Sequence, residues 1–150
     1  MAAFEVDTVL VPVDATDASW EAGDYAVAVA ERYDASLHVL DVLGERVTRA
    51  IQTGDVDSDE VAAEHRRFVE DLAERAEATG VPTSASTAYG FSTSRKTQHP
   101  GSVVLDGADE VGADFVVVPR ESSPDGTSPD VLEKAAEYVL LYASQPVLSV

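Results

Sequence analysis

Polar side chains follow two strongly apolar runs of the sequence, and these positions carry most of its potential chemistry. Asp14 comes directly after VDTVLVPV, and Arg120 lies two residues after DFVVV. A guanidinium can bind an anion through charge-assisted hydrogen bonds, and a carboxylate can accept hydrogen bonds from a ligand. Ser122 and Ser128 lie a little further along the chain and could donate hydrogen bonds. These four side chains are our candidates for a small-ligand site.

Each candidate also has a purely structural interpretation. Asp14 could cap the helix that follows it, and Arg120 could form an ion pair with Glu121 or Asp14. Serines in such loops are more often helix caps or solvated turn residues than ligands. The residues alone leave both interpretations open.

Other kinds of active site lack the residues that they require. The chain has no cysteine, which excludes thiol nucleophiles, disulfides and Cys-ligated metals. Its histidines, His38, His65 and His99, are widely separated and form no metal-binding pair of the HxxxH type. Neither a phosphate-binding P-loop nor a GxSxG nucleophile motif occurs. We therefore expect no catalytic residue, no metal site and no enzymatic activity.

Apolar periodicity predicts alternating strands and helices. Five segments have the composition of strands: 6–13, 35–42, 82–89, 114–118 and 146–150. Three of them are strongly apolar, whereas 82–89 is polar enough for an edge strand. Four segments have helical spacing or helix-capping residues: about 18–32, 58–79, 102–111 and 128–143. Residues 43–57 are expected to be irregular.

This alternation predicts a single α/β domain over residues 1–150, with a parallel sheet and helices on both faces. Right-handed crossovers give a doubly wound five-stranded sheet in the order 3-2-1-4-5, a Rossmann-like or flavodoxin-like fold. Such sheets bind ligands where the strand order reverses, beyond the carboxyl ends of strands one and four. The loops that meet there begin at Asp14 and Pro119.

The chain is strongly acidic. It carries 28 acidic and 10 basic residues, a formal net charge of −18, and the acids are spread along its length. This charge repels phosphates and anionic lipids, so we expect no nucleic-acid and no membrane partner. Dispersed acidity is typical of a halophilic protein, because high salt screens the repulsion between its acidic residues. An acidic protein that works at ordinary salt concentrations has the same pattern. No basic, apolar leader is visible, and we expect a cytoplasmic location.

Four segments together resemble the universal stress protein family. They span nearly the whole chain: VLVPVDATDAS at 9–19, GVPTSASTAYG at 80–90, GADEVGADFVVVPR at 107–120 and AAEYVLLYASQPVLSV at 135–150. The resemblance implies an adenine nucleotide alpha hydrolase-like version of the doubly wound fold. In members that bind ATP, it also places Asp14 beside adenine and ribose and the backbone of Val42 against adenine. Val42 could equally be plain strand core.

The glycine motif of the ATP-binding members is missing. Those members carry Gly-x-x-Gly and, further on, Gly-Ser/Thr after strand four, where backbone N–H groups approach phosphates. Here Pro119 replaces the first glycine, a serine stands near the second, and Glu133 and Lys134 replace the last pair. The resemblance therefore implies a non-enzymatic stress-response module without a cofactor. The alternative is a member that binds ATP or AMP, with Mg²⁺, through an altered loop.

The last strand predicts an assembly. The segment PVLSV at 146–150 is an edge in the expected strand order, and it is short, apolar and uncharged. Antiparallel pairing with the same strand of a second copy would satisfy both edges, and the family resemblance implies the same dimer. We expect a homodimer through this strand, and we leave open a further protein partner or small ligand.

Overall fold

The computed structural model describes residues 5–89, 99–120 and 131–150. The strands in these ranges are β1 (Thr8–Val13), β2 (Ser36–Leu43), β3 (Thr83–Tyr89), β4 (Phe115–Val118) and β5 (Val147–Ser149). The helices are α1 (Asp17–Tyr33), α2 (Glu45–Thr53), α3 (Ser58–Glu77), α4 (Pro100–Val111) and α5 (Val131–Tyr142). None of the helices in these ranges is long and apolar enough to cross a membrane.

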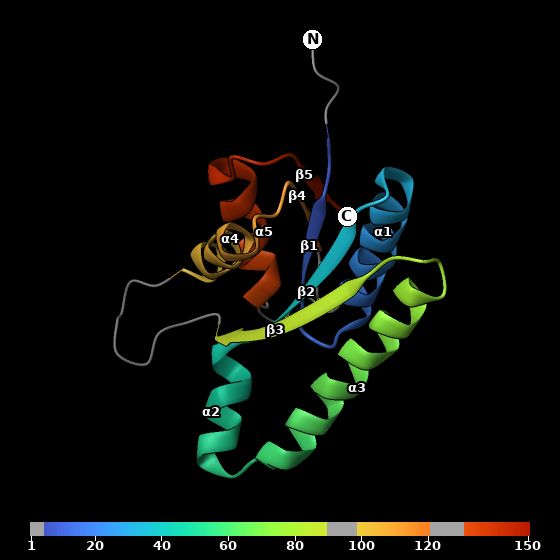
Figure 1. The fold of residues 1–150 in the computed structure, drawn as a ribbon. Coiled ribbons are helices and arrows are strands. Elements are labelled where there is room, and N and C mark those ends of the chain that lie inside the picture. Colours follow the sequence, from blue (N-terminus) through green and yellow to red (C-terminus); the bar gives the residue numbers. More distant parts are fainter. Residues whose placement is uncertain (1–4, 90–98, 121–130) are drawn as a thin grey trace.

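The strands form one parallel sheet in the order β3-β2-β1-β4-β5. Helices α1 and α3 cover one face, and α4 and α5 cover the other (Figure 1). The predicted doubly wound fold and strand order are confirmed, and β3 and β5 are the two edge strands.

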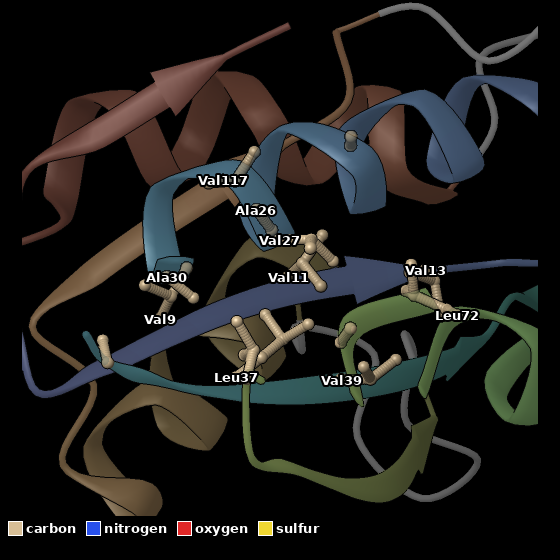
Figure 2. Close-up of a cluster of buried hydrophobic side chains, with 14 of the residues drawn as sticks. Val9, Val11, Val13, Ala26, Val27, Ala30, Leu37, Val39, Leu72 and Val117 are labelled. Atoms are coloured by element: carbon tan, nitrogen blue, oxygen red, sulfur yellow. The ribbon is translucent and has the colours of Figure 1, made fainter. Parts of the chain in front are cut away.

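The two central strands supply two hydrophobic cores, because successive side chains of a strand point to opposite faces. Val9 and Val11 of β1 pack with α1 and α3 in the first core (Figure 2). Leu10, which lies between them, packs with Leu40 of β2 against α4 and α5 in the second core. Both strands are nearly continuous apolar runs since helices cover both of their faces.

A glycine brings α3 close to α1. The side chain of Leu72 in α3 lies so near Gly23 of α1 that a Cβ at Gly23 would stand 2.8 Å from its methyl groups. Trp20 and Phe68 extend this contact as an edge-to-face ring pair with centroids 5.5 Å apart. These contacts fix α3 over the sheet, and α3 carries one of the functional candidates described below.

The expectation that residues 43–57 are irregular is wrong. They contain α2, which Gly44 caps at its start and Gly54, in the left-handed conformation with φ 81°, ends. Val47 and Ile51 are four residues apart and half-buried, so they form a narrow apolar stripe. The stripe is short and lies among polar and acidic neighbours, which made it easy to miss.

Helix α4 begins earlier than predicted, at Pro100 rather than Ser102. His99 is the N-cap: its Nδ1 accepts a hydrogen bond from the backbone N–H of Gly101, 3.0 Å away. Histidine is not among the usual N-cap residues, so the sequence indicated a later start. The predicted cap of α5 at Ser128 lies outside the described residues.

Candidate functional site

The strand order reverses between β1 and β4. The loops that follow the carboxyl ends of these two strands form the switch region. The two strands run parallel, with Leu10 opposite Val116. Asp14 and Arg120 each lie four residues beyond that pair, so both follow the carboxyl end of their strand. The topology therefore brings the loops of these two candidates to the same end of the sheet, as predicted.

Asp14 holds the loop that starts α1. Its Oδ1 accepts hydrogen bonds from the hydroxyl and the backbone N–H of Thr16, at 2.5 and 3.3 Å. Thr16 in turn caps α1 through a reciprocal capping box with Ser19. The intervening Ala15 has a left-handed backbone, with φ 65°. Asp14 thus has the structural role of supporting a helix cap, while it stays half-buried at the switch region.

Val42 lies beside Asp14, because β1 and β2 pair with Val13 opposite Asp41. Its side chain is fully buried in the core that α4 and α5 cover. The strand-core interpretation therefore holds for the side chain. A contact of its backbone with adenine stays a prediction.

Arg120 lies two residues beyond the end of β4 and is exposed. Its backbone N–H donates to the carbonyl of Val150, 2.8 Å away, so β5 anchors the start of its loop. The exposed guanidinium is placed where an anion could reach it, and its role as a ligand-binding group stays a prediction. The candidates Ser122 and Ser128 lie outside the described residues.

A buried histidine–aspartate pair, which sequence reasoning missed, lies next to the switch region. Nδ1 of His65 in α3 donates a hydrogen bond to Oδ1 of Asp41 in β2, at 2.6 Å. Both residues are only 6% exposed. The hydrogen bond to Asp41 raises the pKa of His65 above its ordinary value, against the effect of burial, and the charges of Asp41, Glu64 and Asp14 add to the rise.

The sequence held a signal for this pair. Asp41 interrupts the apolar run of β2, and a buried carboxylate needs a partner. His65 falls on the inward face of α3, at helical spacing from Phe68, Leu72 and Ala76. Two polar residues on inward faces of neighbouring elements indicate a buried pair, although they do not say that the two will meet.

The other histidines have different partners. Nδ1 and Nε2 of His38 in β2 lie 2.8 Å from the hydroxyl oxygens of Ser84 and Ser86 in β3. Burial lowers the pKa of His38. Within the described ranges, no group of three or more His, Cys, Asp or Glu residues could hold a metal ion.

Comparisons with known proteins identify the class of protein. The model of the universal stress protein family matches residues 5–150. The chain therefore belongs to this family. No curated protein sequence matches it closely enough to count as a relative.

Solved structures of the same family share the fold. A universal stress protein from Burkholderia pseudomallei has 20% identity and a TM-score of 0.69, covering 99% of this chain and 98% of that one. A universal stress protein in complex with cAMP has 22% identity and a TM-score of 0.66, covering 98% of each chain. One from Archaeoglobus fulgidus in complex with dAMP has 18% identity and a TM-score of 0.61, again over 98% of each chain.

Proposed function

We propose that this universal stress protein is a non-enzymatic, dimeric stress-response module that acts through protein contacts and binds nucleotide weakly or not at all. The observation that carries this proposal is the outer edge of β5, with which no strand of the described residues pairs, beside an exposed apolar end of α5. A sheet edge that is neither charged nor covered is a template for pairing with another chain.

The end of α5 adds apolar area to that edge. Leu140, Leu141 and Tyr142 are 52%, 70% and 65% exposed, and α5 packs against β5. The ring of Tyr142 rests on that of Tyr138, with centroids 4.7 Å apart. Adjacent large apolar side chains on a surface are typical of an interaction site. Edge and patch together favour a second copy of the chain as the partner.

The ladder between β4 and β5 shows which backbone groups are available to that partner. Val150 exchanges two hydrogen bonds with the chain of β4, through its N–H at 2.9 Å and its C=O at 2.8 Å. Every second residue of a parallel ladder bonds to the same neighbour. Leu148 therefore also faces β4, whereas the N–H groups of Val147 and Ser149 face the open edge.

Proline substitutions at neighbouring positions can separate the two sides of β5. We expect light scattering in molar KCl, where salt screens the −18 charge, to give a dimer. Ser149→Pro removes an outward N–H and should give a folded monomer. Leu148→Pro is the matched control, since it removes a bond to β4 and should lower stability. A monomeric wild type, or a dimeric Ser149→Pro variant, would place the interface elsewhere.

Halophily stays a prediction. It is tested by the melting temperature, which should rise from low salt to molar KCl.

Weak nucleotide binding is supported by the charges at the switch region. Asp14 places a half-buried carboxylate at the carboxyl end of β1. A triphosphate there would be repelled, and the sequence lacks the glycines that would supply backbone donors. We expect equilibrium dialysis with ATP and Mg²⁺ in molar KCl to show no binding tighter than about 100 μM. Tighter binding, or ATP that co-purifies, would overturn this part.

A second candidate function is the binding of an adenine nucleotide with a single phosphate, such as AMP. Similar structures were solved with cAMP and with dAMP, and a monophosphate brings less negative charge to the switch region than ATP does. Dialysis with AMP beside ATP distinguishes the two candidates. If AMP binds, Asp14→Ala and Arg120→Ala should each weaken it, and Arg120→Ala should weaken ATP binding more than AMP binding.

A further inference from the structure

A pocket of about 670 Å³ lies between α2, α3 and the β2–β3 side of the sheet. Helices α2 and α3 extend from this side of the sheet and converge at the turn that joins them (Figure 1). The volume is within the range of pockets that enclose small molecules. Small side chains on facing elements leave the space, among them Ser58 and Ala62 of α3 and Ala85 of β3.

The pocket is distinct from the predicted nucleotide site. Asp14, Val42 and Arg120 are not among the residues that line it. The pocket opens on the face of the sheet that α1 and α3 cover, because its wall residue Asp41 follows Leu37 and Val39 at every second position of β2. The side chain of Val42 is buried on the opposite face.

The walls are largely apolar and their charges balance. Leu43 of β2, Ile51 of α2, and Val61 and Val69 of α3 line the pocket and are only half-buried. The charged residues of the lining are two acids and two bases: Asp41, Glu70, His65 and Arg66. With His65 protonated, these four charges cancel. An ionic ligand would upset this balance, whereas an uncharged apolar molecule would cover the half-buried side chains.

His65 supplies a directional contact. Asp41 occupies its Nδ1, so the carboxylate fixes the orientation of the ring. Nε2 forms no hydrogen bond with the described residues, and it is a donor when the ring is charged. The surrounding carboxylates Asp41, Glu64 and Asp14 favour the charged form, and burial opposes it. Arg66, the other basic residue of the lining, is exposed. The ring therefore offers a hydrogen-bond donor at the wall of the pocket.

We propose that this pocket binds an uncharged, mainly apolar small molecule whose carbonyl or hydroxyl oxygen accepts a hydrogen bond from Nε2 of His65. This site is additional to the dimer edge and to the nucleotide site of the proposed function. Its occupancy depends on neither of them.

The neutral aromatic ketone prodan is a suitable probe, because its emission shifts to the blue in an apolar environment. We expect saturable binding in molar KCl that excess ATP does not displace. The negatively charged dye ANS should bind more weakly than prodan, since the pocket has no surplus positive charge. ANS binding as tight as that of prodan would contradict the inference that the ligand is uncharged.

Two matched variants locate the binding. Ala62 and Ala63 are both exposed on α3, but only Ala62 lines the pocket. Ala62→Trp should fill the space and weaken prodan by about tenfold or more, whereas Ala63→Trp should leave it unchanged. Equal effects of the two variants would overturn the proposal, because the probe would then bind elsewhere. Circular dichroism checks that both variants fold.

The role of His65 has its own test. His65→Asn keeps a donor for Asp41 and removes the position of Nε2, so prodan should bind about fivefold more weakly, as expected for one hydrogen bond. In the unaltered protein, ¹⁵N spectra of the three histidines provide a measurement that does not depend on a variant. Prodan should shift Nε2 of His65 and leave His38 and His99 unchanged. A shift confined to the other histidines, or no shift at saturation, would contradict the assignment.

Discussion

Two buried histidines of this protein respond to burial in opposite ways. His38 lies between the hydroxyls of Ser84 and Ser86, and burial lowers its pKa. His65 is buried to a similar extent, but its hydrogen bond to Asp41 raises its pKa. Loss of water disfavours the imidazolium at both sites, and only a carboxylate partner reverses the outcome. The partner, rather than the depth of burial, decides the direction in which the pKa of each ring is shifted.

Strand β2 creates this contrast by itself. His38 and Asp41 are three residues apart, so their side chains point to opposite faces of the sheet. The face of His38 meets serines of the edge strand β3, and the face of Asp41 lies beneath α3. One strand therefore places a histidine with a lowered pKa on one side of the sheet and, on the other, the acceptor for a histidine with a raised pKa.

The largest effect should come from removing the carboxylate. Asp41→Ala leaves His65 buried without its acceptor, and we expect a loss of about 3 kcal/mol in the free energy of unfolding, the usual cost of breaking a buried pair. Urea denaturation at pH 6 in molar KCl measures it. Asp41→Asn keeps an acceptor oxygen and should cost less. The contrast between the two histidines would be contradicted if Asp41→Ala lowered the free energy of unfolding no more than the loss of a serine beside His38 does.

Asp41 and His65 also show where sequence reasoning ended. The strand order and the two edges follow from local patterns, because each strand and most helices are recognisable by their own residues. The pair depends on how far along its axis α3 lies over β2, and the contact between Gly23 and Leu72 fixes that position. Such a contact joins residues far apart in sequence, so no local pattern reveals it.

Helix α2, which the sequence did not reveal, explains why the pocket was not predicted. Its half-buried residue Ile51 forms part of the wall opposite α3. A segment predicted to be irregular could not be expected to build a wall, so the pocket was not foreseen. The positions of Asp14 and Arg120 at the switch region could be predicted because topology alone places the ends of β1 and β4 together.

The two histidines should titrate on opposite sides of the ordinary pKa of 6.5. The stabilisation from His65 is fully present below pH 6.5 and is lost as the pH rises through its higher folded pKa. His38 acts in reverse: the folded state loses stability as the pH falls from 6.5 through its lower folded pKa. Histidine NMR resolves the two titrations. In Asp41→Asn, His65 should titrate at lower pH and His38 should not change. Titration of both rings on the same side of 6.5 would remove the contrast.

The serines beside His38 should matter less than Asp41. A neutral imidazole has one donor and one acceptor, so one serine accepts from the ring and the other donates to it. We expect Ser84→Ala and Ser86→Ala each to cost about 1 kcal/mol in urea denaturation at pH 8, where the ring is neutral. Thr87→Ala, on the same strand, controls for the lower strand preference of alanine. Costs no larger than this control would mean that water replaces the serines at the exposed edge.

The smallest expected effect separates the contact with Asp41 from the field of more distant charges. Glu64 and Asp14 raise the pKa of His65 through charge alone, without a hydrogen bond, and salt screens such interactions. The pKa of His65 should therefore fall slightly between low salt and molar KCl, yet stay above 6.5 because the buried bond to Asp41 is screened much less. The pKa of His38 should move less, since burial is what lowers it. The same NMR titration, repeated across the salt series, measures both. If the pKa of His65 drops to 6.5 in molar KCl, the distant carboxylates rather than Asp41 maintain its charge, and the contrast between the two histidines is a property of the acidic surface.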